Sequence, residues 1–286
     1  METGKLYLCA TPIGNLEDIS IRTLNILKSV DLIACEDTRH SLKMLTHFGI
    51  SKPLTSYFEH NKTEKGLKII EKIKEGKNVA LITDAGTPAI SDPGEDLVRL
   101  CAEHGIDTVP VPGPVALINA LIVSGLYTGR FSFEGFLSVN KKSRAEHLEE
   151  VKNDTRTLIF YEAPHKLLRT LTDMSKVFGD RRISLVREIT KIHEEVFRTT
   201  LFEAVAFYTE NQPKGEFVLV IEGKSGAELL KERSDEFENI SVTEHIDRFI
   251  AEGLDKKEAI KKVSVLRNMK KRDVYNEYVK NTEGEN

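Results

Sequence analysis

Short apolar runs alternate with helical patterns in the first part of the chain. Apolar residues spaced three or four positions apart predict a helix over 19–30, and Pro93-Gly94 precedes a second helix over 96–103. Nearly continuous apolar runs predict strands at 6–10, 31–35, 79–83 and 109–111. Because single helices separate these strands, we expect a mostly parallel sheet that is buried on both faces.

The pattern changes after residue 129. A charged segment predicts a helix over 141–152, and further apolar runs predict strands at 131–137, 158–161, 183–186, 196–201 and 217–221. The connections between these strands are shorter, which favours antiparallel or mixed pairing. We therefore expect an α/β protein with an N-terminal α/β domain at 1–113 and a second α/β domain at 114–224.

The last part of the chain has helical patterns. Residues 225–240 are polar without a sustained period, which is typical of a linker. Two capping-box spacings, Ser241 with Glu244 and Asp255 with Glu258, begin apolar periodic segments. We expect a small C-terminal helical unit at 241–286, in which residues 281–286 form a frayed tail.

Composition narrows the class of protein. The 286 residues hold 41 Lys and Arg against 45 Asp and Glu, which excludes a uniformly basic nucleic-acid binder. The longest apolar stretch, 115–123, is far shorter than the ~20 residues of a membrane span, and the N-terminus lacks a secretory pattern. Three cysteines without a Cys-x-x-Cys pair predict neither a disulfide framework nor a cysteine-rich zinc site, so we expect a cytoplasmic protein.

Glycine- and proline-rich turns follow three of the predicted parallel strands. The usual dinucleotide and phosphate-loop glycine motifs and the His-Glu-x-x-His zinc motif are absent, and the eight histidines are scattered, so we expect no metal site. The turns at 10–15, 83–94 and 111–116 fall at carboxyl strand ends, where open parallel sheets bind ligands. A single turn of this kind is more often a simple connection, but three together indicate a shared small-ligand cleft.

Charged residues follow another buried strand. In one interpretation the segment 36–39 only caps the next helix and forms a local ion pair. In the other, Glu36, Asp37 and Arg39 lie at the mouth of the cleft, where they orient or deprotonate a substrate. Arg187 and Glu188 form a second pair of this type.

An ordered set of motifs makes the functional interpretation more specific. The motifs are 6–18, Glu36-Asp-Thr-Arg39, 83–94, Pro112-Gly-Pro114, Phe133-Glu-Gly-Phe-Leu137, Tyr161-Glu-Ala-Pro-His165 and Arg187-Glu-Ile-Thr190. Over nearly the whole chain they resemble the bacterial 16S (small-subunit) ribosomal RNA (cytidine-2′-O-)-methyltransferases of the tetrapyrrole methylase superfamily. The resemblance implies a two-domain fold with the donor cleft between the domains, S-adenosylmethionine as methyl donor, ribosomal RNA or the small ribosomal subunit as partner, and a homodimer.

The resemblance also implies donor-binding positions. Where the superfamily has Gly-Asp-Pro, this chain has Gly86-Thr-Pro88, so the carboxylate of that loop is missing and Asp84 is a nearby substitute. Without the resemblance, Ile90, Val115 and Ile189 would be read as ordinary core residues. The positions carried over are Pro12, Asp84, Gly86, Thr87, Ile90, Val115, Ala116, Tyr161, Glu162 and Ile189.

Methyl transfer to a ribose hydroxyl is helped by a proton acceptor. Asp37 or Glu36 is the expected proton acceptor, and Arg39 is expected to bind a phosphate. Glu188 is the other candidate for the proton acceptor. Between 256 and 272, eight basic residues accompany only Glu258, which favours phosphate contacts over a merely solvated face. The expected RNA-binding residues are Lys256, Lys257, Lys261, Lys262, Arg267, Lys270, Lys271 and Arg272, with a second group of Lys141, Lys142 and Arg144. The alternatives are a tetrapyrrole C-methyltransferase and a non-catalytic RNA-binding factor of ribosome assembly.

Overall fold

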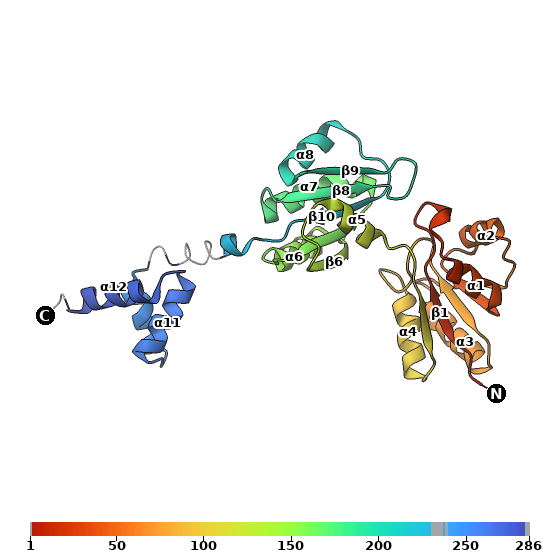
Figure 1. Ribbon diagram of the computed structural model, residues 1–286, viewed down its shortest axis with the longest axis horizontal. Helices are drawn as coiled ribbons and strands as arrows, with labels where there is room; N and C mark the ends of the chain where they lie inside the picture. The colour runs from red at the N-terminus through yellow and green to blue at the C-terminus, as the bar shows by residue number, and fades with distance from the viewer. Residues whose placement is uncertain (1, 230–236, 238–239, 284–286) are drawn as a thin grey trace. The chain divides into compact units, whose positions relative to one another are not determined.

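The computed structural model describes residues 2–229, 237 and 240–283 (Figure 1). By internal packing the chain divides into two compact units, one of residues 1–147 and 157–222 and the other of residues 148–156 and 223–286. The first unit contains two five-stranded sheets and their helices, which confirms the predicted α/β class.

The first sheet is entirely parallel. Its order is β3-β2-β4-β1-β5, with β1 at Leu6–Cys9, β2 at Leu32–Cys35, β3 at Leu54–Ser56, β4 at Val79–Ile82 and β5 at Thr108–Val111. Val79 and Leu81 of the central β4 belong to one buried cluster, and Ala80 and Ile82 belong to the opposite one. Because both faces are buried, the strands have the continuous apolar runs seen in the sequence.

Two helices cover each face of this sheet. Helices α1 (Ile21–Ser29) and α2 (Thr38–His47) pack on one face through Leu27 and Leu45. Helices α3 (Lys62–Lys74) and α4 (Gly94–Glu103) pack on the other through Ile69 and Leu97. Helix α1 begins two residues later than expected, because the Ser20 hydroxyl accepts a hydrogen bond from the Thr23 N–H at 3.0 Å and caps it there, behind a 3-10 turn at Leu16–Asp18.

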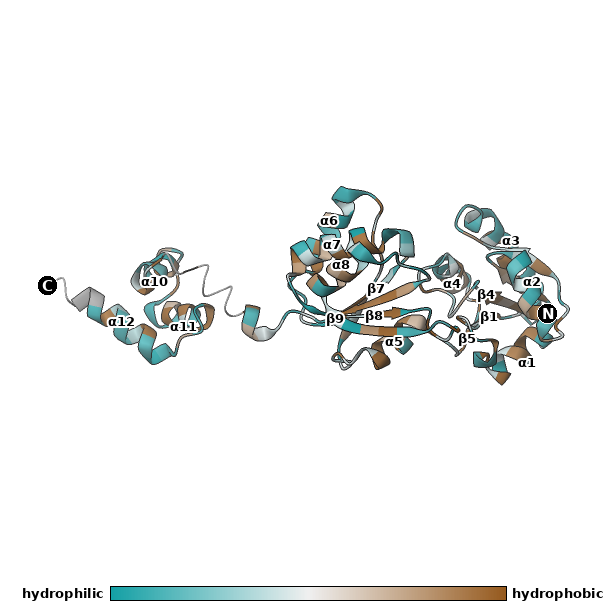
Figure 2. Ribbon diagram, turned by 90° about the horizontal axis from the view of Figure 1, so that it is seen from above, coloured by the Kyte–Doolittle hydropathy of each residue, from teal (hydrophilic) through white to brown (hydrophobic). Residues whose placement is uncertain are grey.

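The second sheet is mixed. Its order is β6-β7-β10-β8-β9, with β6 at Phe131–Phe136, β7 at Thr157–Glu162, β8 at Arg182–Arg187, β9 at Glu195–Thr200 and β10 at Phe217–Ile221. Strands β6 and β7 pair in parallel, and the other pairs are antiparallel. Helix α5 (Ala116–Ser124) packs on one face, while α7 (Leu167–Phe178) and α8 (Leu201–Glu210) lie on the other (Figure 2).

The two sheets meet through the turns at their strand ends. The Asn15 N–H donates to the Thr190 hydroxyl at 3.2 Å, so the turn after β1 contacts the loop between β8 and β9. A Cβ atom at Gly14 would lie only 2.5 Å from Cγ of Lys191, which is why this approach requires glycine. The sheets lie on either side of residue 113, yet both belong to one compact unit, so the division into domains 1–113 and 114–224 stays a prediction.

The second unit contains three helices packed on a small core. Helices α10 (Val242–Ala251), α11 (Lys256–Leu266) and α12 (Lys271–Glu283) bury a cluster that includes Ile246, Ile260, Val263 and Val274. In both expected capping boxes the first residue caps the helix, since Ser241 accepts from the Glu244 N–H at 3.0 Å and Asp255 from the Glu258 N–H at 2.8 Å. The last turn of α6 (Lys141–Val151), residues 148–151, is also assigned to this unit.

Two expectations near the C-terminus are only partly described. Within the predicted linker 225–240, residues 226–229 are helical, while 230–236 and 238–239 lie outside the described residues. The expected frayed tail does not begin at 281, because α12 continues to Glu283, and 284–286 again lie outside the described residues.

Disulfides, membrane-spanning helices and metal-binding clusters are further features that bear on the class of protein. Cys9, Cys35 and Cys101 are all buried and form no disulfide. Within the described ranges, no helix has the length and apolar character needed to cross a membrane. The described residues also contain no group of three or more His, Cys, Asp and Glu side chains arranged to hold a metal.

Candidate functional site

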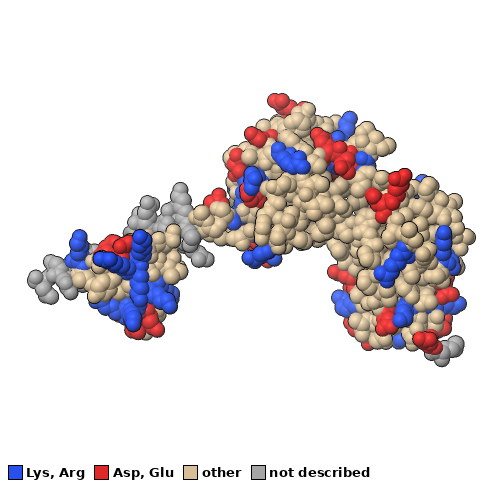
Figure 3. Space-filling view, viewed as in Figure 1, with Lys and Arg blue, Asp and Glu red and all other residues tan. Residues whose placement is uncertain are grey.

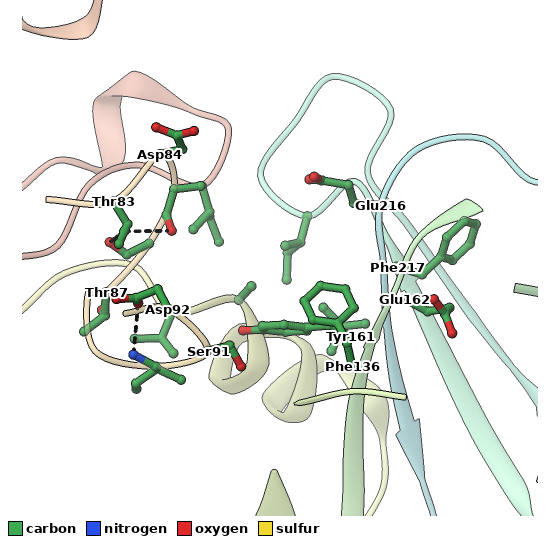
Figure 4. A pocket seen from close by; sticks show the side chains of 18 of the residues that line it. Thr83, Asp84, Thr87, Ser91, Asp92, Phe136, Tyr161, Glu162, Glu216 and Phe217 are labelled. Carbon is green, nitrogen blue, oxygen red and sulfur yellow. Dashed lines mark hydrogen bonds between the residues drawn. The ribbon is translucent and has the colours of Figure 1, made fainter. Parts of the chain in front are cut away.

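A cavity of about 360 Å³ opens between the strand ends of the two sheets in the first unit (Figure 4). One side consists of residues that follow β1, β2, β4 and β5, and the other side consists of residues at the ends of β6, β7, β8 and β10. The volume lies within the range of about 300–1,000 Å³ that is common for small-molecule sites.

The loop after β4 is shaped by one carboxylate. Asp92 accepts hydrogen bonds from the backbone N–H groups of Ala89 at 3.0 Å, Ile90 at 3.1 Å and Gly94 at 2.7 Å. These bonds hold Ala89 and Ser91 at φ values of 70° and 62°, which non-glycine residues rarely adopt. Burial raises the pKa of Asp92, although the three N–H donors oppose this effect.

The same loop is fastened to the turn after β1. Thr11 and Gly86 form an isolated antiparallel bridge, with N–H to O distances of 2.9 and 3.2 Å. Gly86 has φ +83°, and a Cβ atom there would lie 3.3 Å from Cγ2 of Ile13. The backbone of Gly86 therefore lines the cavity in a conformation that glycine alone adopts without strain.

Tyr161 connects the second sheet to the start of α5. Its hydroxyl accepts a hydrogen bond from the Leu117 N–H at 3.1 Å, and burial raises its pKa. The rings of Phe133 and Phe136 contact Tyr161 edge-on, with centroids 4.9 and 5.5 Å away. The rings of Tyr161 and Phe136 give the cavity an aromatic wall beside Val115 and Ala116 at the start of α5, and Phe133 packs behind Tyr161.

Glu162 is a buried carboxylate with its own partners. Its oxygens accept from the Ala163 N–H at 2.9 Å and from the Thr170 hydroxyl at 2.5 Å. It lines the cavity, but these bonds fix its position.

Glu188 is held even more firmly. Its Oε1 accepts from Lys191 Nζ at 2.9 Å and from the Glu216 N–H at 2.8 Å. Burial raises the pKa of Glu188, but these two donors outweigh it and hold the pKa below its ordinary value. Arg187, the other half of the predicted pair, instead contacts Glu195 at 2.9 Å. Glu188 lines the cavity as an anchored group rather than as a free base.

The residues after β2 separate into two roles. Asp37 caps α2 by accepting from the Arg39 N–H at 2.8 Å, and it pairs with the Arg39 guanidinium at 3.0 Å. This partnership lowers the pKa of Asp37 to about 2, and Asp37 does not line the cavity. The helix cap and the ion pair therefore occupy the Asp37 carboxylate, and its role as proton acceptor stays a prediction that this geometry does not favour.

Glu36, by contrast, lines the cavity. Partial shielding from water raises its pKa above the ordinary value, and the negative charges of Asp84 and Asp92 add to the effect. Asp84 also accepts a hydrogen bond from the Asp37 N–H at 3.2 Å and so ties the two loops together. Of the four catalytic candidates, Glu36 alone combines a place in the wall with a raised pKa.

Nine of the ten expected donor residues line the cavity, and the exception is Pro12, which lies between Thr11 and Ile13. Asp92, Lys191 and Glu216 were missed. Asp92 had a signal in its Ser-Asp-Pro-Gly turn, whereas the other two reach the cavity only through the folding of the second sheet.

The charge of the cavity wall is negative. Lys191 accompanies six carboxylates, those of Glu36, Asp84, Asp92, Glu162, Glu188 and Glu216.

One expected RNA-binding residue is part of the structure's interior. Arg144 is 3% exposed, bonds Asp173 at 2.8 Å and donates to the carbonyl oxygens of Ser138 and Val139. This burial argues against a phosphate contact by Arg144, whereas Lys141 and Lys142 on the same helix are exposed.

The basic residues of the C-terminal unit also differ among themselves (Figure 3). Arg267 is committed to internal contacts with His245 Nδ1 at 3.1 Å and with the carbonyl oxygens of Ile240 and Ser241. The ammonium groups of Lys256 and Lys262 lie over the rings of Tyr278 and Phe249, at 4.7 and 4.1 Å. The exposed remainder is Lys257, Lys261, Lys270, Lys271 and Arg272.

Comparison with known proteins places this architecture in a family. Residues 5–205 match the family model of Tetrapyrrole (Corrin/Porphyrin) Methylases. The chain is 47% identical to a Bacillus subtilis protein over 97% of this chain and 94% of that protein, and 48% identical to one from Halalkalibacterium halodurans over 97% and 95%. Both are named Ribosomal RNA small subunit methyltransferase I.

Solved structures share the fold. A crystal structure of diphthine synthase superposes with a TM-score of 0.63 at 15% identity, over 78% of this chain and 91% of that one. A cobalt precorrin-4 methyltransferase superposes with a TM-score of 0.55 at 19% sequence identity, over 76% of this chain and 94% of that one. The chain therefore belongs to the tetrapyrrole methylase family and, within it, to the ribosomal RNA small subunit methyltransferase I group.

Proposed function

We propose that this protein transfers a methyl group from S-adenosylmethionine to the ribose 2′ oxygen of a cytidine in small-subunit (16S) ribosomal RNA. The observation that carries the proposal is the cavity at the junction of the two sheets, in a chain that matches small-subunit ribosomal RNA methyltransferases over almost all of its length. The specific nucleoside and oxygen come from the resemblance described above. The tetrapyrrole alternative is weaker, because the relatives at 47% and 48% identity are named ribosomal RNA methyltransferases, whereas the solved precorrin methyltransferase is 19% identical.

The wall of the cavity fits the methyl donor. S-adenosylmethionine carries a sulfonium and an ammonium against one carboxylate, and six carboxylates against one lysine favour a ligand with net positive charge. Apolar side chains such as Ile90, Val115 and Ile189 suit the adenosyl part. When bound, the donor supplies an electrophilic methyl group.

Glu36 is the proton acceptor in this proposal. A hydroxyl is a weak nucleophile while protonated, and a base is most effective when its pKa approaches the working pH. Among the candidates, Glu36 alone has its pKa shifted upward, whereas Asp37 and Glu188 have lowered pKa values and fixed partners. In this proposal Arg39, whose side chain is 89% exposed, binds an RNA phosphate.

RNA binding is assigned to two exposed basic groups. Lys257, Lys261, Lys270, Lys271 and Arg272 of the C-terminal unit form the first group, and Lys141 with Lys142 form the second. Their affinity would come from phosphate contacts and would fall as salt is raised. A site of action on ribosomal RNA places the protein in the cytoplasm.

Self-association is proposed for the outer face of α5. Leu117, Ala120 and Leu121 pack against the second sheet, yet Ile118 and Ile122 on the outer side are 39% and 64% exposed. A helix that is apolar all round is normally covered on every side. We infer that a second copy covers this face in a homodimer. Light scattering of Ile122→Glu tests this, because the variant would be monomeric and the exposed control Ile192→Glu would not.

The activity is tested by incubating the protein with radiolabelled donor and small ribosomal subunits, free small-subunit RNA or a porphyrinogen. The expected result is label on RNA or subunits that survives alkali as a 2′-O-methylcytidine dinucleotide, because a methylated 2′ oxygen blocks cleavage of the next phosphodiester. Label on the porphyrinogen would support the tetrapyrrole alternative. Binding of RNA without label on any acceptor would support the non-catalytic assembly factor.

A further inference from the structure

One aromatic side chain of the C-terminal unit faces solvent instead of the core. Tyr275 on α12 is 50% exposed, while Val274 and Tyr278 of the same helix are buried. The Tyr278 hydroxyl donates to Asp247 at 2.9 Å, so this neighbour has a clear structural role. Among the described residues, no hydrogen bond or ring contact involves Tyr275. Packing therefore does not account for a tyrosine at this position.

The surroundings of Tyr275 are cationic. Lys271 and Arg272 lie four and three residues earlier on α12, which places them on the same side of the helix, and both are exposed. Long side chains in a helix lean toward its N-terminus, which favours a Tyr275 ring directed toward the turn that carries these two cations. Lys270 precedes the helix and adds a third exposed positive charge. The opposing charge on this turn is Asp273.

We propose that Tyr275 stacks on an unpaired base of the RNA substrate while Lys271 and Arg272 bind the flanking phosphates. An aromatic ring beside cations is the combination that holds single-stranded nucleic acid, because every base has a face that can stack. A duplex offers no such face, since its bases are already stacked on each other. The proposal rests on the proposed function in taking RNA as the substrate, and it adds that the C-terminal unit holds an unpaired segment.

The test compares full-length variants in binding to a fluorescein-labelled, unstructured single-stranded RNA of small-subunit sequence. Base stacking contributes about 1–3 kcal/mol, so Tyr275→Ala is expected to weaken binding about 5- to 150-fold. Tyr275→Phe keeps the ring and is expected to bind as the unchanged protein does. The control Tyr127→Ala removes a tyrosine that is 67% exposed in the first unit, and it should leave binding unchanged.

Salt dependence separates the stacking residue from the phosphate ligands. Tyr275→Ala should leave the slope of log affinity against log salt unchanged. Each phosphate contact to a single strand contributes about 0.7 to that slope, so the double variant Lys271→Gln/Arg272→Gln, which removes two contacts, should reduce it by about 1.4. Binding to heparin, a polyanion without bases, should be insensitive to Tyr275→Ala.

Several results would overturn the proposal. Unchanged RNA affinity in Tyr275→Ala would do so, and so would an equal loss for heparin or a loss that Tyr275→Phe shares. Hydrogen exchange of α10–α12 shows whether Tyr275→Ala remains folded, and a loss of affinity with faster exchange there would also count against stacking. Failure of the proposed function is distinct, because it would appear as unlabelled subunits with the unchanged protein, whatever the binding of Tyr275→Ala.

Discussion

Replacing Glu36 by Gln is expected to slow methyl transfer about 10²- to 10⁴-fold, the contribution of a positioned general base. The structure sets the contrast with the neighbouring carboxylate. The pKa of Glu36 lies above its ordinary value of 4.5, while the cap and ion pair hold that of Asp37 at about 2. Asp37 is thus a weaker proton acceptor by more than about a hundredfold. Asp37→Asn, whose amide oxygen still caps α2, should slow transfer less than about tenfold.

Single-turnover methylation of small subunits, measured across pH, checks this reasoning. With the unchanged protein the rate should rise with pH through an ionisation above 4.5, because Glu36 acts only when it is deprotonated. Glu36→Gln should remove that rise along with the rate. Rates compared at saturating donor, with donor affinity measured by calorimetry, separate the chemical step from the loss of one wall charge.

The matched carboxylate variant is Glu188→Gln. Because Glu188 is anchored by Lys191 and the Glu216 N–H, its replacement should weaken donor binding through the loop and leave the shape of the pH profile intact. A Glu36→Gln protein that keeps near-normal rates would refute the assignment. Equal losses in Glu36→Gln and Asp37→Asn would refute the distinction between the two carboxylates.

Three further changes test the architecture. Gly86→Ala should cost about 1–2 kcal/mol of stability, because alanine is strained at a positive φ. It should also weaken donor binding in calorimetry, because the new methyl group approaches Ile13. The control Gly49→Ala, at φ +65° with no atom within 4 Å of the new Cβ, should lose stability only. Arg144→Ala should lower the free energy of unfolding in urea by up to about 3 kcal/mol, since it removes a buried arginine and leaves the partly buried Asp173 without this partner. It should leave the salt dependence of RNA binding unchanged. Acidification should destabilise the C-terminal unit. Burial and the charge of Arg267 hold the pKa of His245 below 6.5, so the unfolded state binds the proton more readily than the folded unit. Protection of α10–α12 from hydrogen exchange should therefore fall as the pH drops below about 6.5.

Each of these changes has an outcome that contradicts it. Equal donor affinity in Gly86→Ala and Gly49→Ala would remove the close approach to Ile13 as a determinant of the site. A reduced salt slope in Arg144→Ala would return Arg144 to the RNA-binding set. Protection factors in α10–α12 that rise on acidification, after correction for the intrinsic pH dependence of exchange, would show that His245 is easier to protonate in the folded unit than in the unfolded chain.

Much of the fold followed from local pattern. The strands of the first sheet were visible because burial on both faces makes them continuously apolar, and both caps in the C-terminal unit depend on neighbours only three residues away. Strand β3 was missed because its three residues, Leu-Thr-Ser, are half-buried at the sheet edge and carry no such run. The turns at strand ends predicted a cleft for the same local reason, since glycine and proline constrain the backbone wherever they occur.

Roles within the site did not follow from local pattern. Glu36 and Asp37 are adjacent and equally acidic, and they diverge because one faces the cavity and the other caps a helix. Lys142 and Arg144 are close in sequence as well, yet Arg144 is buried against Asp173, a residue of another helix. Lys191 and Glu216 entered the site only because the second sheet brings their loops together.

The sequence by itself determined every described strand except β3, both caps of the C-terminal unit and the turns at the strand ends, because apolar period, capping spacing and turn chemistry act over a few residues. The family followed from the resemblance of its ordered motifs. The tertiary structure alone decided which carboxylate is free to accept a proton, which cations remain exposed and which tyrosine of α12 faces solvent. Those properties depend on partners distant along the chain, whose approach sets burial and hydrogen bonding and therefore the pKa and availability of each side chain.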